Sequence, residues 1–349
     1  MLASKNSDFA SGASTNDRLQ LPFLTVVIPI YNEEATIRIC LESISLQDYP
    51  EDRYEILAID GGSTDETRAI IRNECLPKIG NLRLLDNPKR IQSAALNIGI
   101  KAAIGEIIVR LDAHTLAPKR YFKTVAELMK STGADHLGGI FLTRGSGIWG
   151  KSIAAAMSHK FGVGNSLHRT STSDGINDLG ALGAYRKSAF EKYGGFDEEL
   201  RVCEDCEFGY RVMKAGGIVY RSGKIQFTYF ARKSLLRLFK QYYLYGLYKV
   251  MLMRKVGSVP KARHVIPLVF VLNLITGIFL TVSGSSFTSI FVSSLLLYIA
   301  MALYFAFKAS PKGVKYVLPI CACFITLHVS YGVGSLTGMA SWASNKMRA

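Results

Sequence analysis

Long apolar stretches toward the C-terminal end constrain this chain more than any other feature. Residues 265–307 contain no charged side chain, and Ser-Gly-Ser-Ser at 283–286 divides them into stretches of 18 and 21 residues. A helix rises about 1.5 Å per residue, so each stretch can cross the hydrocarbon core of a bilayer. Two adjacent apolar runs of this length are rare in soluble cores, so the sequence predicts transmembrane helices.

A third uncharged run covers residues 316–345. It is long enough to span a membrane, but it contains Pro319 and glycines at 332, 334 and 338. Glycine and proline at this density predict a broken or re-entrant segment. Three full spans would also place Lys346 and Arg348 outside, against the preference of basic residues for the cytoplasm. Two or three membrane spans both remain open.

Charge is distributed unevenly along the chain. All 27 Asp and Glu residues lie at or before Glu207, whereas 18 of the 42 Lys and Arg residues follow it, which gives residues 208–349 a net charge of +18. Nine of these cations lie between residues 230 and 263, and the flanks of membrane spans with such clusters face the cytoplasm. The apolar runs between the charges favour anionic lipid as a partner and exclude nucleic acid.

Strand and helix patterns alternate in the part that precedes the apolar runs. Strands are expected at 23–30, 54–60, 82–86 and 106–112, and helices at 34–46, from the Ser/Thr caps of 63–67 onward, and at 91–103. The alternation predicts an α/β domain with a mainly parallel sheet covered on both faces. Residues 1–22 are polar and Ser-rich, without an apolar signal-peptide core, and predict a disordered tail.

Polar clusters follow three of the predicted strands, at Pro29 to Glu33, Asp60 to Asp65, and Asp112 to His114. Ligands of such sheets bind outside the carboxyl ends of the strands, so the three clusters are expected to share one crevice. Asp112 and His114 are spaced to serve one metal ion. The alternative is that His114 only ends the strand.

Two further segments lie in the second half of the domain. Residues 178–200 predict a Gly-rich strand, a short helix and a Gly-Gly-Phe-Asp turn, and residues 203–217 predict a helix with Glu204 and Asp205 in its first turn. Acidic residues at that position stabilise the helix dipole, so taken alone they need no catalytic explanation.

Six motifs occur together in a fixed order: "PIYNEE" (29–34), "IDGGSTDET" (59–67), "AALNIGI" (94–100), "RLDAHT" (110–115), "GGFDEEL" (194–200) and "EDCEFGYR" (204–211). Over roughly residues 23–263 the chain thereby resembles the family 2 glycosyltransferases, which have the Rossmann-like GT-A fold. "FGVGNS" (161–166) and "QYYLYGLYK" (241–249) are most similar to the succinoglycan-type glucosyltransferases of exopolysaccharide synthesis, which extend lipid-linked oligosaccharides at the bacterial inner membrane.

The resemblance assigns donor-binding roles to residues of the first two clusters. Pro29, Tyr31 and Glu33 would line the nucleotide pocket, and Asp60 would accept a hydrogen bond from the uracil of a UDP-sugar. Gly61 stands where family members often have a second acid, so the contact with the base would rest on Asp60.

The resemblance also implies a divalent metal ion. Asp112 would contact the ribose or the metal, and His114 occupies the second position of the family's metal-binding DxD motif. A divalent ion offsets the negative charge of the leaving diphosphate. A neutral imidazole in place of a carboxylate softens the site, which favours Mn²⁺ without excluding Mg²⁺.

An inverting transfer needs a carboxylate that takes the proton of the attacking hydroxyl, and Asp205 is the expected base. Glu204 would orient Asp205 or stabilise the helix. An ionised polyprenyl phosphate acceptor would need no base, so the acidic pair favours a hydroxyl of a lipid-linked saccharide. Processive synthases of the family carry Q-x-x-R-W, whereas Gln241 is followed here by Leu244 and Tyr245. A single-addition enzyme is therefore expected.

The expected organisation is a tail (1–22), a GT-A domain (23–230), an amphipathic interfacial region (231–263) and a membrane domain (264–345). The expected function is that of a multi-pass inner-membrane hexosyltransferase with its catalytic domain in the cytoplasm. One alternative is a polyprenyl-phosphate glycosyltransferase. The alternative of another class is a transport or channel subunit with a nucleotide-binding domain, which the absence of charged residues inside the spans disfavours.

Overall fold

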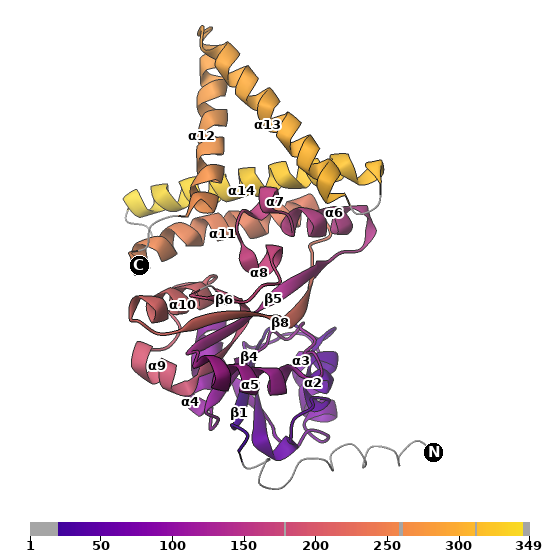
Figure 1. Ribbon diagram of the computed structural model, residues 1–349. Helices are drawn as coiled ribbons and strands as arrows, with labels where there is room; N and C mark the ends of the chain where they lie inside the picture. The colour runs from indigo at the N-terminus through magenta and orange to yellow at the C-terminus, as the bar shows by residue number, and fades with distance from the viewer. Residues whose placement is uncertain (1–19, 178, 258–260, 311–312, 345–349) are drawn as a thin grey trace. The chain divides into compact units, whose positions relative to one another are not determined.

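The computed structural model describes residues 20–177, 179–257, 261–310 and 313–344 (Figure 1). The predicted disordered tail lies outside these residues except for its last three positions. The chain forms two compact units. The first comprises the residues up to Leu137 together with Leu182–Gly195, and the second comprises Gly138–Ala181 together with the residues from Phe196 onward.

The first unit is built on a mainly parallel sheet, which confirms the predicted fold class. Its strands are β1 (Leu24–Ile30), β2 (Tyr54–Asp60), β3 (Leu82–Asp86), β4 (Ile107–Arg110) and β7 (Ala181–Arg186), in the order β3-β2-β1-β4-β7. The helices are α2 (Ile37–Ser45), α3 (Thr67–Ile70), α4 (Gln92–Ala102), α5 (Tyr121–Thr132) and α9 (Lys187–Tyr193), with short turns at Glu51–Arg53 and Ile71–Cys75. All neighbouring pairs are parallel except β4 and β7, which are antiparallel.

The register of the parallel strands brings their carboxyl ends to one edge of the sheet. Ile30 pairs with Asp60, and Asp60 pairs with Asp86. β2 is buried along its whole length, as its continuous apolar sequence predicts for a central strand. The segments that follow β1, β2 and β4 therefore start close together, and they carry the three polar clusters.

The hydroxyl groups of residues 63–67 do not cap the helix that they were predicted to open. α3 begins at Thr67, and its N-cap residue, Glu66, makes no side-chain cap. The Ser63 hydroxyl donates instead to Asp60 (2.5 Å), and the Thr67 hydroxyl accepts from the backbone N–H of Glu33 (2.8 Å). These hydroxyl groups connect the strand ends, and that use competes with capping.

The second unit carries the long helices. Its strands are β5 (His136–Arg144), β6 (Gly175–Ile176) and β8 (Val219–Phe230), in the order β5-β8-β6. Its helices are α6 (Gly147–Met157), α7 (Lys160–Val163), α8 (Leu167–Thr170), α10 (Glu204–Lys214), α11 (Leu235–Val256), α12 (Ala262–Val282), α13 (Thr288–Ala309) and α14 (Val317–Ala343), with a turn at Val314–Tyr316. α11 lies within residues 231–263, and the interfacial role of this region stays a prediction.

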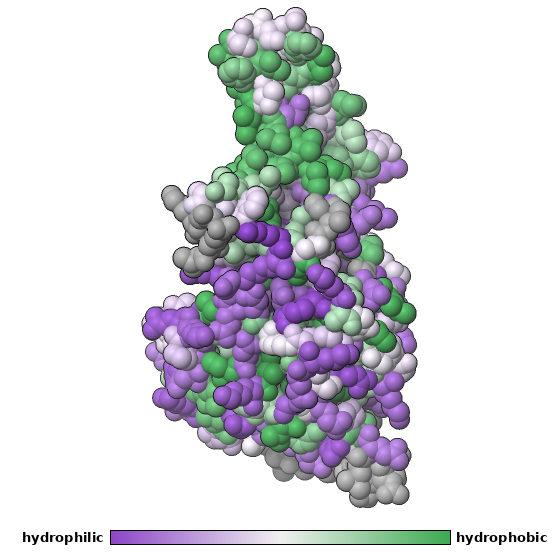
Figure 2. Space-filling view, turned by 90° about the vertical axis from the view of Figure 1, so that its left-hand side faces the viewer, coloured by the Kyte–Doolittle hydropathy of each residue, from purple (hydrophilic) through white to green (hydrophobic). Residues whose placement is uncertain are grey.

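Among the residues that the structure describes, three helices are long and apolar enough to cross a membrane, and two of them, α12 and α13, coincide with the predicted spans. Figure 2 shows apolar surface gathered over α12 and α13, where side chains such as Ile278, Phe279 and Leu297 are exposed. In their most apolar 18-residue stretches, α12 and α13 are only 17% and 11% buried inside the protein, whereas the corresponding stretch of α14 is 50% buried. α14 therefore packs largely on protein, whereas α12 and α13 present their apolar side chains outward.

α14 is one continuous helix, so the prediction of a broken segment is wrong. Pro319 lies in its first turn, where a missing N–H leaves no hydrogen bond unmade. A Cβ on Gly332 would lie 2.2 Å from the carbonyl oxygen of Pro267 in α12, and one on Gly334 would lie 2.0 Å from that of Tyr243 in α11. The glycines allow close packing of backbones. In Figure 1, α14 runs beside α11 across the base of α12.

Candidate active site

Hydrogen bonds join the segments that follow β1 and β2. The backbone N–H of Asn32 donates to the Ser63 hydroxyl (2.9 Å), and the Asn32 side chain accepts from the backbone N–H of Thr64 (2.8 Å). Asn32 has a φ of 54°, in the left-handed region that asparagine tolerates better than most residues. Two of the three polar clusters are thus joined into one surface.

Asp60 organises the turn at the end of β2. Its side chain is fully buried and accepts hydrogen bonds from Arg68 (2.6 Å), from the Ser63 hydroxyl (2.5 Å) and from the backbone N–H of Gly62 (3.1 Å). Both carboxylate oxygens are therefore used within the protein. The contact of Asp60 with a uracil ring stays a prediction.

Arg68 joins the ends of β2 and β3, and the sequence analysis missed it. Its guanidinium lies 2.6 Å from the carboxylates of both Asp60 and Asp86, and these hydrogen bonds, with that to Asp86 the stronger, raise the pKa of Arg68. Its signal in the sequence was that two predicted neighbouring strands both end in an aspartate, Asp60 and Asp86. Two carboxylates at one edge need a cation between them, which predicts a nearby Arg or Lys.

Tyr31 and Arg90 lie beside the turn at residues 61–62. Tyr31, 51% exposed, follows β1 directly, and a Cβ on Gly61 would lie 3.5 Å from its ring. Arg90 is exposed, and its Nε would lie 3.4 Å from a Cβ on Gly62. Pro29, inside β1, is only partly buried. An aromatic ring and a guanidinium beside one turn suit a base and a phosphate.

His114 is paired with Glu33. The Nδ1 atom of His114 lies 3.0 Å from Glu33 Oε1, and the Thr36 hydroxyl donates to Glu33 Oε2 (2.7 Å). Burial opposes the charge on Glu33, but the hydrogen bonds from His114 and Thr36 outweigh it and lower the pKa of Glu33. A carboxylate at Nδ1 favours the proton on that nitrogen and fixes the orientation of the imidazole ring.

Asp112 lies two residues beyond the end of β4. Its Oδ1 accepts hydrogen bonds from Gln92 (3.2 Å) and Arg110 (3.4 Å), and its side chain is 24% exposed. Burial, together with the charges of Asp112 and Glu33, raises the pKa of the Cys40 thiol to about 12.

The donor set at this edge fits a divalent ion in part. Asp112 supplies a carboxylate and His114 an imidazole that Glu33 orients, which are ligands that Mn²⁺ and Mg²⁺ accept. Within the described residues, however, no group of three or more His, Cys, Asp or Glu side chains is arranged to hold a metal. The remaining ligands would have to come from a bound molecule and water.

Glu204 and Asp205 belong to the second unit, at the start of α10. The N-cap residue is Cys203, which has a φ of 69° and makes no side-chain cap. Glu204 is only 3% exposed, whereas Asp205 is partly exposed and its Oδ1 accepts from the backbone N–H of Cys206 (2.7 Å). The first unit brings together the other predicted site residues, which are Pro29, Tyr31, Glu33, Asp60, Asp112 and His114.

Known proteins resemble this chain in sequence. Residues 25–194 match the model of a family described as "Glycosyl transferase family 2". "Succinoglycan biosynthesis protein ExoA" of Rhizobium meliloti is 34% identical over 256 residues, which cover 73% of this chain and 77% of that protein. "Dolichyl N-acetyl-alpha-D-glucosaminyl phosphate 3-beta-D-2,3-diacetamido-2,3-dideoxy-beta-D-glucuronosyltransferase" of Methanococcus voltae is 30% identical over 67% of this chain and 74% of that protein.

A solved structure shares the fold. It is "Mannosyltransferase PcManGT from Pyrobaculum calidifontis in complex with GDP-Man and Mn2+", with a TM-score of 0.65 and 20% sequence identity. The match covers 92% of this chain and 88% of that one.

Because Arg68 pairs with a buried carboxylate, replacing it should lower the stability of the protein more than replacing Arg38, whose ion pair is exposed. Arg68→Ala leaves a buried carboxylate without its cation and should destabilise the protein by about 3–5 kcal/mol. Arg38→Ala breaks an exposed pair with Glu74 (2.6 Å) and should cost at most about 1 kcal/mol. Unfolding of the full-length protein in detergent measures both, and equal losses would contradict the role assigned to Arg68.

Proposed function

Because this chain belongs to glycosyl transferase family 2, we propose that it transfers a sugar from a UDP-sugar to a hydroxyl group of a lipid-linked saccharide at the cytoplasmic face of a membrane. The chain is a glycosyltransferase with the GT-A fold, related to enzymes of exopolysaccharide and lipid-linked glycan synthesis. The observation that carries the proposal is the Glu33–His114 pair at the edge where the parallel strands end, near the exposed ring of Tyr31.

The donor is assigned to the first unit. The exposed ring of Tyr31 offers a face for stacking of the base, and the guanidinium of Arg90 offers charge-assisted hydrogen bonds to phosphate. The solved structure of the same fold contains GDP-Man. The choice of uridine here rests on the contact with uracil that the family resemblance implies for Asp60. Asp60 then acts on the base directly or through the turn that it holds.

Asp112 and His114 would hold the divalent ion, with Glu33 fixing the imidazole ring of His114. Such an ion would stabilise the negative charge of the departing nucleoside diphosphate. The solved structure of the same fold is a complex with GDP-Man and Mn²⁺. The imidazole ligand favours Mn²⁺ here, and Mg²⁺ is the alternative.

Chelation is expected to abolish transfer, and Mn²⁺ should restore it at least as well as Mg²⁺. His114→Asp should shift the preference toward Mg²⁺, because a second carboxylate hardens the site. Glu33→Gln should weaken Mn²⁺ binding in the presence of UDP by about 10- to 100-fold, since Glu33 orients the ligand. Mn²⁺ binding is followed by electron paramagnetic resonance, with Glu42→Gln as the exposed control. Full activity in chelator would remove the metal from the account.

Asp205 is assigned as the general base. The acceptor oxygen forms a bond to the anomeric carbon, the bond from that carbon to the diphosphate breaks, and Asp205 takes the hydroxyl proton. Exposure supports Asp205 over Glu204, because Asp205 is partly exposed whereas Glu204 is buried. The named activity of the Methanococcus voltae relative, transfer to a sugar on a lipid phosphate, is of the same kind.

Asp205→Asn should lower turnover by about 10²- to 10⁴-fold, because the shape is kept and the proton acceptor is lost. UDP binding should stay close to that of the unsubstituted enzyme, since the donor residues lie in the first unit. Asp52→Asn, at an exposed site, is the matched control. Turnover within about threefold of the control would make Glu204 the next candidate base, because base removal costs far more.

The membrane arrangement proposed here has two spans, α12 and α13. Support comes from the burial of α14 within the protein and from its course beside α11, which suits a position along the membrane surface. The cations of residues 230–263 and those at 308–315 would then face the cytoplasm together with the catalytic part.

Reporter fusions test this arrangement. A green fluorescent protein fused after the last residue should fluoresce, and alkaline phosphatase at that position should be inactive, because the C-terminus stays in the cytoplasm. Fusions after Ser283, between the two spans, should give the opposite pattern and serve as the control. Active phosphatase at the C-terminus would establish a third span.

A further inference from the structure

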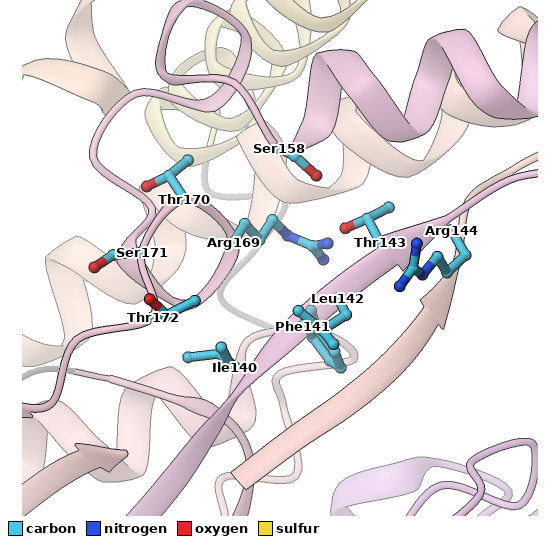
Figure 3. A pocket seen from close by; sticks show the side chains of 10 residues that line it. All are labelled: Ile140, Phe141, Leu142, Thr143, Arg144, Ser158, Arg169, Thr170, Ser171 and Thr172. Carbon is cyan, nitrogen blue, oxygen red and sulfur yellow. The ribbon is translucent and has the colours of Figure 1, made fainter. Parts of the chain in front are cut away.

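A cavity of about 560 Å³ lies in the second unit, apart from the residues assigned above (Figure 3). One wall is the second half of β5, from Ile140 to Arg144, and the other is the segment from Arg169 to Thr172. Ser158, directly after α6, completes it. The volume suffices for a group larger than a few water molecules.

Two polar atoms at this cavity are buried and unsatisfied. Within the described residues, neither Nη1 of Arg169 nor Oγ1 of Thr143 has a hydrogen-bond partner. Leaving a buried donor unpaired costs free energy, most of all for a charged group. Figure 3 shows both side chains between the two walls. The pair points to a bound group that accepts hydrogen bonds from the guanidinium and the hydroxyl.

The guanidinium of Arg169 is held in place by aromatic rings. It lies 5.0 Å from the centroid of Phe141 and 4.6 Å from that of Tyr229, within the range of cation–π attraction. The Tyr229 hydroxyl accepts a hydrogen bond from Gln241 (2.7 Å), and the same amide donates to Tyr245 (3.0 Å). Arg169 is thus oriented before any ligand arrives, which lowers the entropic cost of binding.

The charges around the cavity select an anion. Arg144 and Arg169 are the only charged residues among those that line it, and no carboxylate is present in that lining. Burial, and then the positive charges of Arg169, Arg263 and Lys249, hold the pKa of the neighbouring His168 well below its usual range. A guanidinium with hydroxyl groups around it matches the geometry of phosphate oxygens.

The cavity is connected to the apolar helices through α7. Phe161 packs against Phe324 of α14 with ring centroids 5.0 Å apart, and His328 of α14 lies 2.8 Å from the Phe161 carbonyl oxygen. Arg169 follows Phe161 by eight positions, so the same segment touches α14 and lines the cavity. Because this segment packs against one of the apolar helices, a phosphate bound in the cavity is expected to be that of a membrane lipid.

We propose that this cavity binds the phosphate or diphosphate group of the lipid that carries the acceptor saccharide, with Arg169 and Thr143 as its direct ligands. The assignment rests on the proposed function for the identity of the lipid. Gln241 is then a positioning residue that acts through Tyr229. Gln241 would then have a role in acceptor binding, although this chain lacks the Q-x-x-R-W motif of processive synthases.

Binding of polyprenyl diphosphate to the full-length protein in nanodiscs tests the proposal without any sugar transfer. Arg169→Gln should weaken binding by about 10- to 100-fold, and Thr143→Val by less, because the guanidinium also neutralises the phosphate charge and can donate two hydrogen bonds, whereas the hydroxyl donates one. Arg201→Gln, at an exposed site of the same unit, is the matched control and should bind as the unsubstituted protein does. UDP binding, measured alongside, reports that each variant is folded.

Two outcomes overturn the proposal. One is unchanged lipid binding by Arg169→Gln, and the other is inorganic pyrophosphate binding as tightly as the lipid, which would mean a site for a free anion. Where transfer can be assayed, Arg169→Gln should raise the KM for the acceptor and leave the KM for the donor unchanged. Lipid binding that depends on Arg169 in a protein that transfers no sugar would refute the proposed function alone.

Discussion

A carboxylate that is closed off from water has to be paired, and this requirement governs the edge of the sheet on which the donor residues lie. Asp60 ends a fully buried strand, and Arg68 together with the turn at residues 62–63 satisfies it. The turn at residues 62–63 also hydrogen-bonds to Asn32. The next residue, Glu33, contacts His114. The position of the polar residues at this edge therefore depends on the hydrogen bonds of one buried carboxylate, that of Asp60.

Local sequence patterns predicted the framework well, because each depends on neighbouring residues. The continuous apolar run at 54–60 coincides with β2, and the apolar stretches that follow residue 264 coincide with α12 and α13. α14 was misjudged because glycines that break a helix and glycines that let two helices approach look alike in a sequence. Only the partners of Gly332 and Gly334 distinguish the two cases.

The chemistry of the site was predicted only in part, since pairs far apart in the sequence decide it. The resemblance supplied Asp112 and His114, but the carboxylate that orients His114 lies 81 positions earlier. The arrangement around Arg169 likewise joins distant residues: its guanidinium lies over the ring of Tyr229, and the buried hydroxyl of Thr143 lines the same cavity, although no sequence spacing connects the three. In both units, a proposed ligand therefore rests on partners that are distant in the sequence.

The central claim is that the sugar is joined to a hydroxyl group of a saccharide on a lipid. The most direct test supplies a labelled UDP-sugar and lipid-linked acceptor, then treats the lipid product with mild acid, which cleaves sugar phosphoesters and spares glycosidic bonds. The account predicts that the label leaves the lipid as part of a saccharide of at least two units. Release of the label as a free monosaccharide would contradict it, because the enzyme would then have used a polyprenyl phosphate as the acceptor.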